Sequence, residues 1–341
     1  MHSTTKRIDF IDLSKGICIL LVIFSHCEEC FPIKGDYKFV LSSFRMPLYF
    51  MLSGMFFKSY GNFKTFIKKK VNKLIIPFLF FYIVIALILP MIVRYCNIYP
   101  MLDIGKGIMY VFCIYNENFN GMPMGIWFLW CLFIVNIISY CILWIANCIS
   151  KDYKDVIHIM TSILIGSVGY YLGRYQINLP LYIDSAMTAM PFFSVGYLIN
   201  NKTNFLFHNK LDKYNILLAI LGFILIYYII DGGAGFRENR YNSGILALYM
   251  SGIVGSISVL LISKTIKYLP IVSFMGRYSI IVLCTHQLFI LVLKQFFEYS
   301  NIDNLYITVV LFVITSILCY FIIYPLKKYL PYFTAQKELI K

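Results

Sequence analysis

An all-α bundle of membrane-spanning helices is the fold that this sequence predicts, and three observations lead to it. Of the 341 residues, 60% are hydrophobic and only 13% are charged, whereas soluble domains carry about 25% charged residues. The mean hydropathy is +0.75. The apolar residues also gather in stretches of about 20, the length that a helix needs to cross a bilayer. A surface so poor in charge has to face lipid.

Ten stretches of the chain have this length and composition. The first ends in the polar residues 26–29 without a small-residue cleavage site, so we expect a retained helix rather than a signal peptide. We find no internal repeat, linker or appended soluble domain, and therefore predict that residues 1–341 form one transmembrane domain. The predicted spans are 9–28, 38–57, 74–94, 126–148, 156–172, 184–200, 215–230, 244–263, 278–296 and 305–324.

The basic residues predict the orientation of this bundle. The net charge is +14, and the lysines lie in short segments between apolar runs, where they act as topology signals rather than as a nucleic-acid site. With the N-terminus inside, about nineteen basic residues fall in cytoplasmic segments and about eight in outer segments. We therefore predict that both termini are cytoplasmic, as an even number of spans requires, in the plasma or inner membrane.

The first predicted span carries ionisable side chains. Such residues cost several kcal/mol within a bilayer and usually face a cavity or a partner. Lys15 and His26 share one helix face, roughly 16 Å apart along the axis, and Asp12 is close enough to pair with Lys15. This helix face therefore holds either an ion pair plus an interfacial histidine, or it forms one wall of a polar cavity. Glu28 and Glu29, which follow His26, either orient its imidazole or are solvated residues at the mouth of such a cavity, and we expect the second.

Later spans add further polar residues. Arg45 lies within the second span and calls for a partner or a polar cavity. Ser53 precedes Gly54, and small residues in spans commonly allow close helix packing. His286 lies ten residues beyond Gly276, roughly 15 Å deeper. A buried histidine alone is usually structural, but two histidines, an arginine and a lysine in one bundle favour an aqueous functional cavity.

The basic segment from Lys64 to Lys73 follows the second span and is cytoplasmic by the charge distribution. It is either a topology anchor in contact with anionic lipid or a cradle for a phosphorylated ligand, since ammonium groups are point-charge partners for phosphates. Glycine-rich phosphate loops are absent, which argues against a nucleotide-hydrolysing pump. Cys27 and Cys30 form a C-x-x-C pair beside His26, but a second ligand pair is missing, so we predict no metal site.

Several short segments, taken in chain order, are similar to the motifs of one family. They are Asp12-Leu13-Ser14-Lys15-Gly16 with Val22-Ile23-Phe24-Ser25-His26, Phe44 to Gly54, Lys70-Val71-Asn72-Lys73, Trp127-Phe128-Leu129, Phe192 to Tyr197, and Phe274 to His286. On these segments the chain resembles the acyltransferase 3 family of membrane acyltransferases, particularly the branch with fucose acetylases and O-antigen acetylases. No single segment is specific, but their order and spacing together are.

The chain departs from that family pattern at three places. Lys15 replaces the commoner arginine, Lys70 and Lys73 stand where the family has an R-x-x-R pair, and Arg45 stands where this branch often has histidine. The lysines keep the positive charge but lose the bidentate geometry of arginine. The first two departures concern the residues that would contact the acyl donor.

The resemblance implies an O-acyltransferase, in the first place an O-acetyltransferase. Its donor would be acetyl-CoA or another acyl-CoA, used as a substrate and not held as a permanent cofactor, and its acceptor a sugar hydroxyl of a cell-surface or lipid-linked glycan. A neutral imidazole is a suitable general base for such a hydroxyl, and a covalent acyl-histidine is the other route. The implied site is His26 as base, Arg45 and His286 for the carbonyl or the acceptor, Lys15, Lys70 and Lys73 for CoA, and Asp12, Ser53 and Trp127 as substrate contacts.

Two other classes of function fit the composition. A glycan or lipid transporter or flippase would use the same polar residues to line its path, but the inverted repeats and paired broken helices common in transporters are not found in the sequence. A structural membrane partner would leave the intramembrane charges unexplained. A homo-oligomer is compatible with each of these functions.

Overall fold

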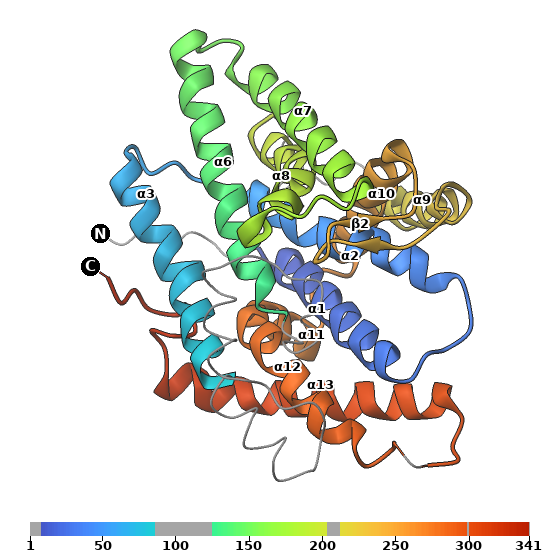
Figure 1. Cartoon of the computed structure of the whole chain (residues 1–341). Coiled ribbons are helices and arrows are strands. Elements are labelled where there is room, and N and C mark those ends of the chain that lie inside the picture. The colour runs from blue at the N-terminus through green and yellow to red at the C-terminus, as the bar shows by residue number, and fades with distance from the viewer. Residues whose placement is uncertain (1–7, 86–124, 203–211, 299, 341) are drawn as a thin grey trace.

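The computed structural model describes residues 8–85, 125–202, 212–298 and 300–340, and this part of the chain is almost entirely helical (Figure 1). The predicted all-α class is therefore confirmed. The strands within the described ranges are β1 (Ala234–Gly235) and β2 (Arg240–Tyr241), which pair in an antiparallel hairpin. They follow α9 and precede α10, and they contact α2 and α7.

The N-terminal half begins with α1 (Asp9–Cys30), α2 (Tyr37–Met55) and α3 (Phe63–Lys70). The side chain of Asn62 caps α3 by accepting a hydrogen bond from the backbone nitrogen of Thr65 at 2.8 Å. The helix then passes through a π-helical turn, η1 (Val71–Ile75), and continues to residue 85. Such turns are frequent at functional sites. The rest of the predicted span 74–94 lies outside the described residues.

The remaining helices complete the bundle. They are α6 (Trp127–Ile149), α7 (Lys154–Arg174), η2 (Pro180–Tyr182), α8 (Ile183–Lys202), η3 (Asp212–Tyr214), α9 (Asn215–Ile229), α10 (Ile245–Ile266), α11 (Pro270–Arg277), α12 (Ser279–Lys294) and α13 (Asn304–Tyr329). The predicted ninth span corresponds to α12, which meets the short helix α11 at a bend of 95°.

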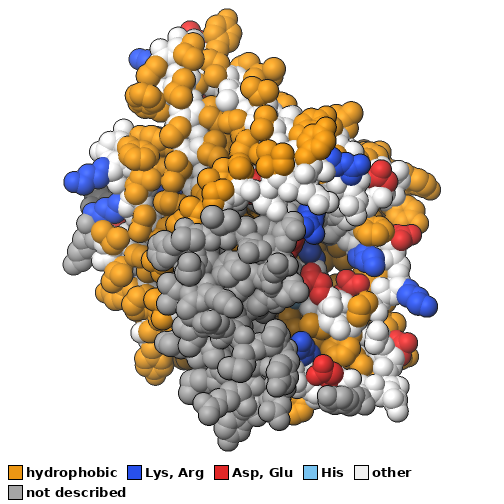
Figure 2. Space-filling model, in the orientation of Figure 1, with side chains coloured by type: hydrophobic (Ala, Val, Ile, Leu, Met, Phe, Trp, Pro, Cys, Tyr) orange, Lys and Arg blue, Asp and Glu red, His pale blue; other side chains and the backbone are white. Residues whose placement is uncertain are grey.

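Apolar side chains cover much of the surface, as a bilayer requires. Figure 2 shows them over the α6 and α7 region, where Trp144 and Leu164 are largely exposed. Five of the described helices (α1, α6, α7, α10 and α13) are long and apolar enough to cross a membrane, or six if α11 and α12 form one broken span. The count of ten spans and the cytoplasmic termini remain predictions.

Glycines fix the close contacts that hold the bundle together. A Cβ atom on Gly276 of α11 would clash with the backbone oxygen of Asp12 in α1, and one on Gly196 of α8 with that of Met51 in α2. Only glycine allows backbones to approach this closely. Helix α1 lies at the centre, in contact with α2, α10, α11, α12 and α13. Its side chains can therefore meet residues from both halves of the chain.

Candidate functional site

Two histidines meet in the middle of this packing. His26 lies near the end of α1 and His286 in α12, and their ring centroids are 5.3 Å apart with an angle of 34° between the planes. His286 is fully buried, whereas 24% of the His26 side chain is exposed. The sequence places these residues 260 positions apart, and the packing of α1 on α12 brings them into one site.

A carboxylate holds His26 in one tautomer. Glu29, one turn further along α1, accepts a hydrogen bond from Nδ1 of His26 at 2.7 Å through Oε2. Because a carboxylate can only accept, Nδ1 carries the proton and Nε2 keeps its lone pair. Ser25 Oγ donates to the other carboxylate oxygen at 3.4 Å. Our expectation that Glu29 is merely a solvated residue at the mouth is thus incomplete: its side chain is half exposed but it also orients the imidazole.

The second histidine is oriented by its own helix. Nδ1 of His286 lies 2.9 Å from the carbonyl oxygen of Val282, which again requires the proton on Nδ1. Nε2 is buried and has no hydrogen-bond partner within the described part of the chain. An unpaired buried acceptor costs about 1–3 kcal/mol, so this atom is suited to a ligand group. A Cβ on Gly125 would press on the His286 ring at 3.1 Å, and the glycine thus leaves room there.

A cavity of about 450 Å³, which we call the lysine cavity, is lined by residues of α1, α2, η1, α6 and α12. Its described lining holds four basic side chains and no carboxylate: Lys15, Lys70, Lys73 and Arg277. Ser53 also lines it, as does Leu283, one turn before His286. The three lysines that the resemblance assigns to CoA therefore line the same cavity, together with Ser53. Arg277 was not singled out from the sequence, although it lies within the matched segment from Phe274 to His286.

Positive charges lie close together in the lysine cavity. Only 8% of Lys70 is exposed, and its Nζ lies 5.3 Å from the ring centroid of Phe57 and 5.6 Å from that of Phe66. Burial, with the nearby positive charge of Lys73, lowers the pKa of Lys70 to about 7. Lysines in a cavity whose described lining has no carboxylate are suited to bind a polyanionic ligand. The negative charge of that ligand would raise the pKa of Lys70 again and favour its protonated form.

A second cavity, of about 400 Å³, lies against the β1–β2 hairpin and is called the hairpin cavity here. Its lining includes Arg45, Glu28, Glu29 and Arg240, with the backbone of β1. Glu29 connects this cavity to His26 through their hydrogen bond, just as Leu283 connects the lysine cavity to the helix turn before His286. Each cavity therefore borders a residue next to the histidine pair, Glu29 in the hairpin cavity and Leu283 in the lysine cavity, while the described lining of neither cavity includes His26 or His286.

Two residues predicted to contact the substrate lie outside both cavities. Trp127, at the start of α6, is buried against the rings of Phe128 and Tyr182, with centroids 6.2 and 5.7 Å away. Asp12 is half-buried in α1, where its backbone packs against Gly276 of α11. Both occupy packing positions next to the site. A residue type and its place in a motif give no indication of which side of a helix interface it will take.

Comparison with known proteins agrees with this arrangement. The model of one family, described as an acyltransferase domain, matches residues 8–324, which include both histidines and all four basic residues of the lysine cavity. Neither the curated proteins nor the solved structures gave a match. Because the family match spans nearly the whole chain, the protein is an acyltransferase built on apolar helices and belongs to the acyltransferase 3 family.

Proposed function

We propose that the protein transfers an acyl group, in the first place acetyl, from acyl-CoA to a sugar hydroxyl of a cell-surface or lipid-linked glycan. The observation that carries this proposal is the histidine pair, in which His26 bonds to a carboxylate and which has a neighbouring residue in each of two polar cavities of different charge. A general base is needed where the thioester meets the hydroxyl, and Nε2 of the neutral His26 ring, which has no proton in this tautomer, is suited to that role.

The donor fits the lysine cavity. Coenzyme A carries a pyrophosphate and a further phosphate, and Lys15, Lys70, Lys73 and Arg277 supply the matching positive charges. Its narrow pantetheine arm would then run past Leu283 towards the histidines, with Ser53 beside it. The acceptor sugar would enter the hairpin cavity, whose carboxylates, arginines and backbone groups offer both hydrogen-bond donors and acceptors.

The transfer itself follows from the tautomers. As the sugar oxygen bonds to the thioester carbonyl carbon, Nε2 of His26 takes the hydroxyl proton, and Glu29 stabilises the imidazolium formed. The intermediate then expels the CoA thiolate, which receives that proton. Nε2 of His286 has a lone pair and no proton, so it can accept a hydrogen bond from a neighbouring hydroxyl of the sugar but cannot stabilise the oxyanion. That role falls to the guanidinium of Arg45. In the covalent variant, Nε2 of His26 attacks the carbonyl first.

Transport of a glycan or lipid is the second candidate, because two cavities on either side of one site also fit a path through a bundle. The family match favours transfer, and the hydrogen bond between His26 and Glu29 is the arrangement that a general base requires.

Mass spectrometry of the surface glycan distinguishes the two functions. Cells with the wild-type protein, cells without it, and cells with equal amounts of His26→Ala are compared. Transfer predicts that an acetyl-sized mass is lost both without the protein and in the variant, while the amount of glycan stays constant. Glycan that disappears from the surface with its mass unchanged would instead establish transport and refute the proposal.

A further inference from the structure

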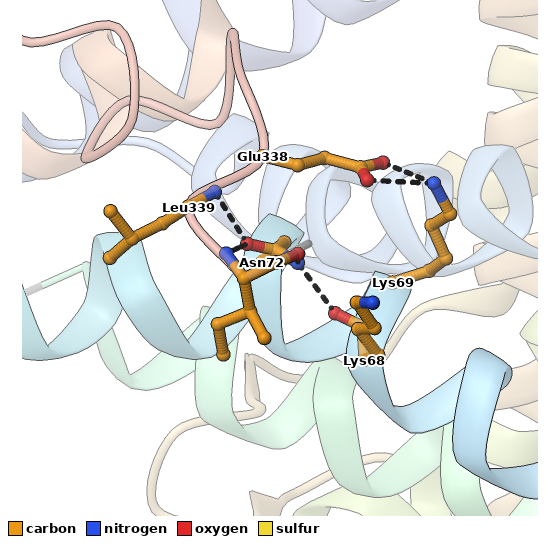
Figure 3. A network of polar contacts seen from close by, with 6 residues as sticks. Lys68, Lys69, Asn72, Glu338 and Leu339 are labelled. Atoms are coloured by element: carbon orange, nitrogen blue, oxygen red, sulfur yellow. Dashed lines mark hydrogen bonds and ion pairs between the residues drawn. The ribbon is translucent and has the colours of Figure 1, made fainter.

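The chain after α13 returns to the lysine cavity. Residues 331–340 turn back along α3 and η1, and Asn72 of η1 receives them (Figure 3). Oδ1 of Asn72 accepts from the backbone nitrogens of Leu339 and Ile340 at 2.8 and 2.9 Å. Its Nδ2 donates to the carbonyl oxygens of Ile340 and Lys68 at 2.9 and 3.0 Å. Only 3% of Asn72 is exposed, and its amide makes every hydrogen bond it is capable of.

Two further contacts hold the same segment. Nζ of Lys69 lies 2.6 and 2.7 Å from the two carboxylate oxygens of Glu338 (Figure 3). At the other end of the segment, the ring of Phe333 stacks on Phe80 with centroids 4.6 Å apart. An exposed ion pair contributes little by itself, so the buried amide of Asn72 is the principal anchor.

Between these anchors the segment forms part of the cavity wall. Ala335 has a φ of 58°, and the turn closes with hydrogen bonds from the backbone nitrogens of Gln336 and Lys337 to the carbonyl of Pro331 at 2.9 and 3.0 Å. Ala335 and Gln336 then line the lysine cavity beside the basic residues. These residues lie beyond position 324, where the family match ends.

We infer that residues 335–340 complete the donor site of this protein, with Gln336 as a donor contact and Asn72 as the positioning residue that holds the turn against the cavity. This inference rests on the proposed function for the identity of the donor. The π-helical turn that contains Asn72 also carries Lys73. One side of this turn thus binds the returning chain while the other contributes a charge to the phosphate site.

The test is equilibrium binding of coenzyme A to the purified full-length protein, together with Michaelis constants for donor and acceptor. Gln336→Ala removes one contact and should weaken CoA binding about three- to tenfold. Asn72→Ala should weaken it at least as much and raise the Michaelis constant for the donor but not for the acceptor. Asn147→Ala, on α6 and outside the lysine cavity, is the matched control and should bind CoA normally.

A charge reversal separates positioning from loss of folding. Lys69→Glu and Glu338→Lys should each weaken CoA binding, and the double variant should recover it. Equal CoA affinity in Gln336→Ala, Asn72→Ala and the wild type would overturn the inference while leaving the proposed function intact. Failure of the wild-type protein to bind CoA at all would instead refute the donor assignment, and the inference with it.

Discussion

At the scale of single residues, hydrogen bonds decide which nitrogen of each histidine is available. Glu29 fixes the proton of His26 on Nδ1, and the carbonyl of Val282 does the same for His286. Both Nε2 atoms are therefore acceptors, yet only His26 has a carboxylate that stabilises its protonated form. This asymmetry supports the proposal that His26 is the base, as the resemblance implies, and that His286 has a positioning role.

The carboxylate of Glu29 gives the sharpest test of this assignment. His26→Ala should reduce the turnover number at least about 100-fold because the general base is lost. Glu29→Gln should reduce it about tenfold with little change in the donor Michaelis constant, because a neutral amide stabilises the imidazolium poorly. Glu28→Gln alters the other carboxylate of the hairpin cavity, so it should affect the acceptor Michaelis constant while leaving the turnover number unchanged. Equal effects of the two Gln variants would contradict the pairing.

The lowered pKa of Lys70 predicts how donor affinity changes with pH. Lys70 loses its charge as the pH rises through about 7, so above that value phosphate binding requires Lys70 to take up a proton. CoA affinity should then fall by up to about tenfold per pH unit between pH 7 and 9. Direct CoA titrations measure this without involving His26. Lys70→Arg stays charged and should flatten the dependence, whereas Lys154→Gln, on α7, should keep it. If the pH dependence of CoA affinity were the same in Lys70→Arg as in the wild type, a group other than Lys70 would be responsible for it.

At the scale of the helices, the motif glycines serve packing and thereby shape the site. Gly54 and Gly196 bring α2 against α8, and Gly16 and Gly276 bring α1 against α11. Ser53, next to Gly54, faces the lysine cavity. The sequence offers close packing and substrate contact as alternatives for the Ser53-Gly54 pair. In the structure Gly54 makes the packing contact and Ser53 faces the cavity, because neighbouring positions on a helix point in directions about 100° apart.

The substitution Gly196→Ala should therefore lower the stability of the bundle without changing any residue of the candidate site. Its Cβ would clash with the backbone oxygen of Met51, and overpacking of this kind costs about 1–3 kcal/mol. Thermal unfolding of the purified protein in detergent should show a lower midpoint for Gly196→Ala. Gly244 has an ordinary φ of −61° and open space around its Cβ position, so Gly244→Ala is the control and should melt like the wild type. Identical midpoints would refute the packing argument.

At the scale of the whole molecule, periodicity and composition predict what is local. The all-α class follows from the apolar stretches, and the shared face of Lys15 and His26 follows from helical spacing. The 95° bend between α11 and α12 and the return of the C-terminal segment could not be predicted in this way. The bond between Asn72 and Leu339 joins residues 267 positions apart, and such contacts depend on tertiary packing, which sequence spacing does not encode.

The two cavities also make the orientation of the molecule testable, because the donor has to enter from the cytoplasm. Lys34 lies in the connection after His26 and Glu29, whereas Lys64 lies in α3, the helix whose last residue, Lys70, lines the lysine cavity. Both side chains are exposed. In a variant whose native cysteines, including the exposed Cys141 and Cys148, are replaced by serine, we expect a membrane-impermeant thiol reagent to label Lys34→Cys in intact cells.

The same reagent should reach Lys64→Cys only after the membrane is permeabilised, and the labelling of Lys34→Cys should not increase at that step. This pattern follows from the excess of lysines on one side of the bundle. It would place the basic cavity towards the cytoplasmic CoA pool and the hairpin cavity towards an exported acceptor. The acyl group would then cross the bundle as it passes His26. The reverse pattern would turn the lysine cavity away from CoA, and the donor and acceptor cavities would have to be exchanged.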